Sequence, residues 1–342
     1  MGPVYRQGCN RGREGCREGD DSGRAGLALQ AFRQYPYKDL KTSIRACSVI
    51  CHDIRVEALE PLHQRKENGE IFKNLKNTII AMKLKIKKTN FISSIDSWYR
   101  FAPPERGDSQ WVDGRSAKEF AKYMLSEAGK MPSEIEKYIK SLGWECHDCD
   151  CFPEHVTNFL LEYGTGSGRH HDALFVSKDW VVGVESKVSE SFDSRIEDWL
   201  EKGKKNKDGG KNRKARIKES LRLITGQAYS DKDIESEAIL DLRYQLISAT
   251  VGTILEAKNH NIRKAALLVV EFQGNVLKEK GYMKNINTNS KDYQSFLDFL
   301  QIGEKNDLER KIEVEIDIDY TLSIWFKKIP INVLGPKYSV AE

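Results

Sequence analysis

Long hydrophobic segments are missing from this chain. Within its 342 residues, no apolar run approaches the roughly 18 residues that a membrane-spanning helix needs. The N-terminus is basic but has no apolar segment after the basic residues, which argues against a secretory signal. Hydrophobic residues make up 39% of the chain and charged residues 31%. The sequence therefore predicts a soluble, cytoplasmic protein with no membrane partner.

Cysteine is too scarce for a disulfide-based fold. Seven cysteines, an odd number in a chain of 342 residues, fit a reducing compartment. Four potential zinc ligands do cluster in ECHDCDCFPEH, namely Cys146, Cys149, Cys151 and His155. A structural zinc site normally draws its ligands from two separated segments, so we expect reduced loop cysteines, with a structural Zn²⁺ site as the alternative.

A strong overall charge is also lacking. The formal net charge is +4, but residues 1–90 hold 18 Lys and Arg against 10 Asp and Glu. The remaining residues hold 37 against 41 and are slightly acidic. Any contact with nucleic acid must then depend on a local basic patch.

The amino-acid composition changes near residue 90 and divides the chain into two parts. Residues 1–30 are rich in Gly, Arg and Glu and poor in large apolar side chains, a composition typical of disorder. We expect residues 1–90 to form a disordered or helical N-terminal extension. An alternative start at Met82 would place most of this extension outside the native protein. Residues 91–342 are the predicted folded domain.

The pattern that carries chemistry is a predicted β-hairpin. Two apolar, β-prone runs, 172–176 and 180–184, are separated by turn-forming residues. If residues 178–179 are a two-residue loop, Asp172 lies directly opposite Glu185. Their Cβ atoms would then be about 4.5–5.5 Å apart, so two carboxylates could share one divalent ion.

Lys187 belongs to the same face of this hairpin, because side chains on a strand alternate with a period of two residues. Gly183 shares that face and would leave room for a close approach. The opposite face is apolar, and a strand that is apolar on both faces is usually an interior one. A cross-strand salt bridge on a solvated surface is the plainer interpretation of the three charged residues.

Asp172, a gap of 12 residues and then Glu185-Ser186-Lys187 resemble the signature of the PD-(D/E)xK nuclease superfamily. The resemblance implies an α/β, restriction-endonuclease-like fold, a mixed central β-sheet flanked by helices. It also implies that Asp172, Glu185 and the main-chain carbonyl of Ser186 bind Mg²⁺ or Mn²⁺, while Lys187 positions water or stabilises developing charge. The sequence departs from the family at His171, which replaces a proline. Residues 93–125 resemble the opening of an uncharacterised bacterial branch of these nucleases.

Two further residues follow from the resemblance. In several branches a helix before the Asp strand supplies another carboxylate, and Glu162 occupies that place at the end of a helix expected over 154–163. Other branches place a glutamine on the helix after the Lys strand, which corresponds to Gln245 in a helix expected over 236–257. An ordinary surface glutamate and an ordinary amphipathic helix are the plainer interpretations.

Three segments complete the predicted domain. A basic run, 202–218, contains nine Lys or Arg and one Asp, and its glycine pair at 209–210 favours a loop that could contact a phosphate backbone. Residues 264–273 are a buried strand, parallel to the catalytic one through a helical crossover. Residues 312–320 and 321–329 alternate with period two and form an edge hairpin.

We therefore expect a metal-dependent nuclease that hydrolyses phosphodiester bonds, with DNA as substrate, RNA as an alternative and a restriction, defence or repair role. A homodimer is compatible with the sequence. A catalytically inactive nucleic-acid- or protein-binding module on the same fold is the second hypothesis. An unrelated α/β domain that carries a simple salt bridge is the third.

Overall fold

Residues 264–273 form a strand in the middle of a mixed β-sheet in the computed structural model. The structure describes residues 83–86, 90–127, 130–145, 149–159, 168–205, 209–282, 285–303, 305–335 and 337–340. All of these belong to one compact unit, residues 74–342. The N-terminal extension lies outside the described residues except for two short strands, and Cys146 and Glu162 also lie outside them.

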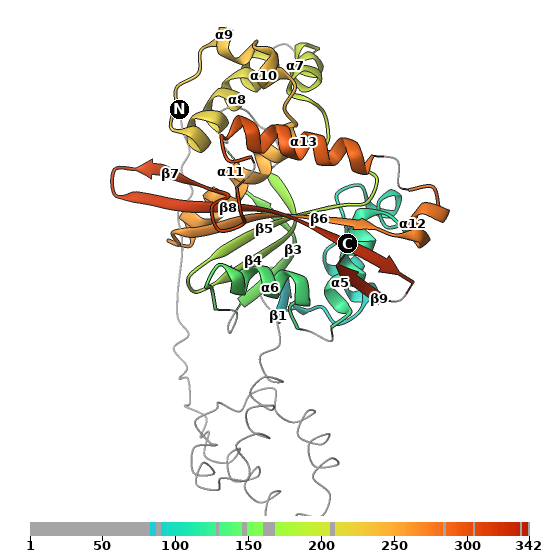
Figure 1. The fold of residues 1–342 in the computed structure, drawn as a ribbon. Coiled ribbons are helices and arrows are strands. Elements are labelled where there is room, and N and C mark those ends of the chain that lie inside the picture. The colour runs from blue at the N-terminus through green and yellow to red at the C-terminus, as the bar shows by residue number, and fades with distance from the viewer. Residues whose placement is uncertain are drawn as a thin grey trace, which may run out of the picture. The chain divides into compact units, whose positions relative to one another are not determined.

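Within the described part of the chain, nine strands form one sheet in the order β2-β1-β3-β4-β5-β6-β8-β7, with β9 paired to β8 (Figure 1). β5 is antiparallel to β4 and parallel to β6, and β6 is parallel to β8. The strands are β1 (Lys83–Ile86), β2 (Asn90–Phe91), β3 (Cys149–Thr157), β4 (Arg169–Ser177), β5 (Val181–Lys187), β6 (Lys264–Gln273), β7 (Lys311–Asp317), β8 (Tyr320–Leu334) and β9 (Lys337–Val340).

Helices cover both faces of this sheet (Figure 1). One face packs against α7 (Ile196–Lys204), α8 (Gly209–Thr225), α9 (Asp231–Ile234), α10 (Glu237–Leu240), α11 (Tyr244–Asn259) and α13 (Ile286–Phe299). The other face packs against α4 (Ile95–Phe101), α5 (Ser116–Leu125), α6 (Ser133–Ser141) and α12 (Asn275–Glu279). A short 3-10 helix, η3 (Gly107–Ser109), joins α4 to α5. The predicted mixed sheet flanked by helices is confirmed.

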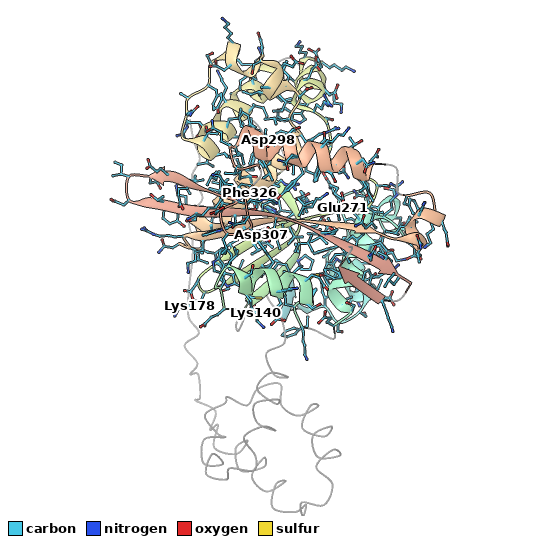
Figure 2. All side chains as sticks on the ribbon, viewed as in Figure 1. Lys140, Lys178, Glu271, Asp298, Asp307 and Phe326 are labelled. Atoms are coloured by element: carbon cyan, nitrogen blue, oxygen red, sulfur yellow. The ribbon has the colours of Figure 1, made fainter. Side chains whose placement is uncertain are left out.

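The predicted hairpin is present as β4 and β5. Ser177 donates its backbone N–H to the carbonyl of Trp180 at 2.9 Å, so residues 178–179 form the expected two-residue turn. Lys178 lies at the periphery of the domain (Figure 2). Every residue of β5 is buried, because β5 lies between β4 and β6 and both of its faces are covered. The chain returns from β5 to β6 through helices, as predicted for a parallel pair.

The prediction of a helix over 154–163 is wrong for residues 154–159, the part that the structure describes. Residues 149–157 are strand β3, which pairs with β4 and with β1. Cys149 and Cys151 alternate in burial with their neighbours, as a strand requires. Pairing with two adjacent strands outweighs the helix-start signal of Pro153, since tertiary contacts routinely override local preference.

Two other expectations about helices need correction. Gly209 and Gly210 begin helix α8 and are not part of a loop, because the helix buries the apolar stripe of Ile217, Leu221 and Ile224 against the core. The single helix expected over 236–257 is divided into α10 and α11. The break allows Leu242 to accept a hydrogen bond from Ile196 at 2.9 Å.

The predicted edge hairpin is confirmed as β7 and β8, which pair antiparallel. β7 ends the sheet. Val314 and Leu322 face the core, as the period-two alternation requires, whereas Ile318 is exposed in the turn between the strands. No helix in the described ranges is both long and apolar enough to cross a membrane.

Candidate active site

A cavity of about 1190 Å³ opens beside the ends of β4 and β5 that lie away from the hairpin turn. Asp172 and Lys187 lie in its wall, together with Gln245 from the first turn of α11. Three of the predicted site residues, from three separate elements, are therefore brought to one cavity. Glu162 lies outside the described residues.

The end of β5 that reaches this cavity is polar and yet buried. Glu185 is 1% exposed and Lys187 is 6% exposed. Gly183, on the same face, is the point at which α11 packs onto the sheet, since an added Cβ would lie 2.1 Å from Oγ1 of Thr253. The close approach predicted at Gly183 is thus made by α11. This contact brings the N-terminal turn of α11, and so Gln245, over Glu185.

Asp172 is held by the peptide that follows Glu185. Its Oδ2 accepts hydrogen bonds from the backbone N–H of Ser186 at 2.5 Å and from the Ser186 hydroxyl at 2.8 Å. The last ladder pair between the strands is Ala173 with Val184, one position before the expected Asp172–Glu185 pair. The two carboxylates therefore lie on adjacent strands next to that pair, and their sharing of one ion stays a prediction.

Glu185 has three polar partners inside the domain. Its Oε1 forms an ion pair with the guanidinium of Arg169. Its Oε2 accepts a hydrogen bond from Nε2 of Gln245 at 2.8 Å and lies 3.9 Å from Nζ of Lys187. Burial lowers the pKa of Arg169 to about 10 and also lowers the pKa of Lys187, although Asp172 favours its charged form. Gln245 therefore contacts the carboxylate of Glu185 directly.

Arg169 was missed by the sequence reasoning. It lies on the same strand as Asp172, but the strand was expected to begin only at Asp172. A longer strand assignment over the GRHHD segment would have included it. Its guanidinium neutralises Glu185 and lines the cavity, so it belongs to the site.

Glu154 was missed for a related reason. It lies in β3 between the pairs Pro153–Ala173 and His155–His171, and is thus opposite Asp172. Its backbone has a φ of 48°, a left-handed conformation that residues other than glycine rarely adopt. Burial and then the charge of Asp172 raise the pKa of the Glu154 carboxyl well above its usual range. A second carboxyl therefore lies beside Asp172, within a segment expected to be a helix.

The cavity is locally cationic. Six basic side chains and four acidic ones line it. The basic ones are Arg106, Arg115, Arg169, Lys187, Arg213 and Arg216, and the acidic ones are Glu105, Asp172, Glu190 and Asp193. The imbalance exists although the domain as a whole is slightly acidic, and it favours an anionic ligand.

The three described residues of the alternative zinc site, Cys149, Cys151 and His155, do not converge. Cys149 and Cys151 pack into the core on the α5 and α6 side of the sheet. His155 instead contacts Glu256 of α11 on the other side, with Nε2 at 3.0 Å from Oε1. Among the residues that the structure describes, no group of three or more His, Cys, Asp and Glu side chains is arranged to hold a metal ion.

Comparison with known proteins places the chain in a family. A family model described as a domain of unknown function, DUF6946, matches residues 91–329. The chain belongs to this family. The DUF6946 match contains β4, β5, β6 and α11. It therefore includes Asp172, Lys187 and Gln245, which lie in the cavity wall. No curated protein matches the chain, and no solved structure matches it.

Proposed function

We propose that this DUF6946 protein is a metal-dependent nuclease that hydrolyses phosphodiester bonds, with DNA as its substrate. The observation that carries the proposal is the convergence of Asp172, Glu185, Lys187 and Gln245 from β4, β5 and α11 beside one cationic cavity. The antiparallel β4–β5 pair, followed by a helical crossover to parallel β6, supports a restriction-endonuclease-like fold.

A divalent cation, Mg²⁺ or Mn²⁺, is part of this proposal. Asp172, Glu185 and the carbonyl of Ser186 would hold it, since Mg²⁺ prefers oxygen ligands. Two observations support the fit. Within the described residues, the buried Oε1 of Gln245 has no hydrogen-bond partner, and burial and then the charge of Asp172 destabilise the charged form of the Glu154 carboxyl. When bound, such an ion polarises a phosphoryl oxygen and lowers the pKa of a coordinated water.

The protein's own groups have separate tasks in this scheme. Ser186 fixes Asp172 through two hydrogen bonds, so the carboxylate keeps one orientation toward the cavity. Gln245 orients Glu185 through its amide N–H. Lys187 stabilises negative charge as it develops on the phosphoryl oxygens. Because the ammonium is buried, its attraction to that charge is weakly screened.

A catalytically inactive nucleic-acid-binding module is the second candidate, and one observation favours it. The Arg169 guanidinium forms an ion pair with Glu185 and thereby satisfies the carboxylate that a cation would use. In this alternative the cavity binds phosphate groups and Arg169 is a permanent substitute for the metal. Arg169 would have to leave Glu185 before a cation could bind in the first scheme.

Cleavage of labelled DNA, with RNA in parallel, by purified full-length protein in Mg²⁺ or Mn²⁺ tests the proposal. Asp172→Asn should lower the rate by about 10³-fold, which is the upper range for losing one group that acts on the transition state. Asp179→Asn is the matched control, because Asp179 is exposed in the turn at the other end of the hairpin, and it should leave the rate unchanged.

Each other outcome has a distinct meaning. A rate that survives Asp172→Asn would show that the assigned site is wrong. A wild-type protein that binds nucleic acid but cleaves neither DNA nor RNA with either metal would establish the inactive binding module.

A further inference from the structure

The basic side chains of helix α8 differ in their partners. Three of them lie on the part of the helix that faces away from the cavity, and each forms an ion pair with a carboxylate. These pairs are Lys214–Glu235 at 2.5 Å, Lys218–Asp231 at 2.7 Å, and Arg222–Glu219. Their charges are neutralised locally, so this part of α8 offers little attraction to an anion.

Arg213 and Arg216 have a different environment, and both line the cavity. The Arg213 guanidinium lies over the Trp199 ring at 4.6 Å, and the Arg216 guanidinium lies over the Phe159 ring at 4.3 Å. Each donates one hydrogen bond to the backbone carbonyl of the aromatic residue beneath it. Among the described residues, neither arginine has a carboxylate within ion-pairing distance.

The two guanidinium groups are held in place by packing. Residues three apart on a helix lie on the same face, so Arg213 and Arg216 project together. Gly203 of α7 admits the stem of Arg213, since an added Cβ would lie 2.5 Å from its Cδ. The aromatic rings fix the planes of the guanidinium groups. Nε of Arg216 is buried and has no hydrogen-bond partner in the described part of the chain, which leaves a donor available.

We propose that Arg213 and Arg216 form a phosphate-binding subsite that contacts the backbone of a nucleic acid away from the reacting phosphodiester. Arginine presents a planar array of donors that matches phosphate oxygens, and oriented guanidinium groups lose less freedom on binding. The subsite shares one cavity with Asp172 and Lys187, so one strand could contact both. The identity of the ligand rests on the proposed function. Such contacts position the substrate and read no sequence.

The salt dependence of binding measures this subsite directly. Each phosphate contact contributes about 0.9 to the slope of log K against log salt concentration for duplex DNA. Full-length Asp172→Asn protein, which should cleave about 10³-fold more slowly than wild type, is titrated with a fluorescent DNA duplex. Adding Arg213→Gln and Arg216→Gln should reduce the slope by about 1.8. Lys214→Gln with Lys218→Gln removes the same charge from the same helix and should reduce it far less.

Equal reductions in the two double variants would overturn the subsite, and so would an unchanged slope after the loss of both arginines. Arg213→Lys with Arg216→Lys keeps both charges and should retain most of the slope. If the double glutamine variant does not fold, Arg213→Gln alone should reduce the slope by about 0.9. Binding is measured on the Asp172→Asn protein and cleavage on the wild type. Expected slopes without cleavage by the wild type therefore refute the nuclease activity alone, and cleavage by the wild type with unaltered slopes refutes the subsite alone.

Discussion

The two halves of strand β5 are equally buried but chemically opposite. Val181, Val182, Gly183 and Val184 form an apolar half, and Glu185, Ser186 and Lys187 form a polar half, with every residue buried. Burial of the apolar half stabilises the fold at about 25 cal/mol per Å² of apolar surface. Burial of the polar half costs free energy unless each charge finds partners.

The difference in the cost of burial suggests a reason for the polar residues at the end of β5. Its partners come from two elements, with Arg169 and Asp172 on β4 and Gln245 on α11, so several side chains are committed to holding two charges inside the domain. If β5 continued with valine residues, its buried side chains would need no polar partners. The protein accepts this cost at the place where the strand meets a cationic cavity, as expected for a functional site.

The largest expected effect on stability comes from breaking the ion pair of the polar half. Arg169→Gln removes the ion pair at Oε1 of Glu185 and leaves Lys187, 3.9 Å from Oε2, as the remaining cation. It should lower the free energy of unfolding by about 3–5 kcal/mol. Urea denaturation at neutral pH measures the change. Arg195→Gln is the matched control, because Arg195 also pairs with a carboxylate, Asp241, but both side chains are largely exposed; it should cost less than about 1 kcal/mol. Equal costs would mean that Arg169 does not compensate Glu185.

A change in the apolar half should have a smaller effect and a different character. Val182→Ala removes apolar volume from a fully buried position and should lower the free energy of unfolding by about 2–3 kcal/mol. Activity per folded molecule should not change, because Val182 faces the α5 and α6 side of the sheet. Urea denaturation and the cleavage rate are measured on the same variant. A loss of activity greater than the loss of folded protein would contradict the proposed difference between the two halves of β5.

The smallest expected effect depends on pH and concerns Lys187. Burial lowers its pKa below the ordinary value of 10.5, so between that lowered pKa and 10.5 the unfolded state binds more protons than the folded state. The stability contributed by this group therefore rises with pH across that window. Lys187→Met lacks this dependence. We expect it to be more stable than wild type near neutral pH, with a difference that shrinks as pH rises toward 10.5, as measured by urea denaturation at several pH values.

Much of the sheet followed from the sequence because its strands have strong periodic signals. The β4–β5 hairpin, the buried run of β6 and the alternating β7 and β8 were all predicted. β3 was not, because Pro153, Glu154 and His155 have the composition of a helix start. That segment continues a strand because it pairs with β4, and such pairing cannot be seen in the segment itself.

The site was predictable to a similar degree and for the same reason. The grouping of Asp172, Glu185 and Lys187 was predicted from their spacing on the hairpin, and Gln245 from the resemblance to the nuclease superfamily. Arg169 and Glu154 depend on the extent of β4 and on the register of β3, so their roles emerge only from the assembled sheet. Among the many cations of α8, the unpaired arginines cannot be distinguished from the paired lysines until the positions of Trp199 and Phe159 are known.

One measurement tests the central claim most directly: the Mg²⁺-dependent cleavage rate and the free energy of unfolding of Lys187→Met, determined on the same preparation. If the polar half of β5 is kept for catalysis, the rate should fall by about 10²–10³-fold, while the free energy of unfolding at neutral pH stays equal or rises. A variant that loses stability together with activity would assign Lys187 a structural role. A variant that keeps the wild-type rate would contradict the account.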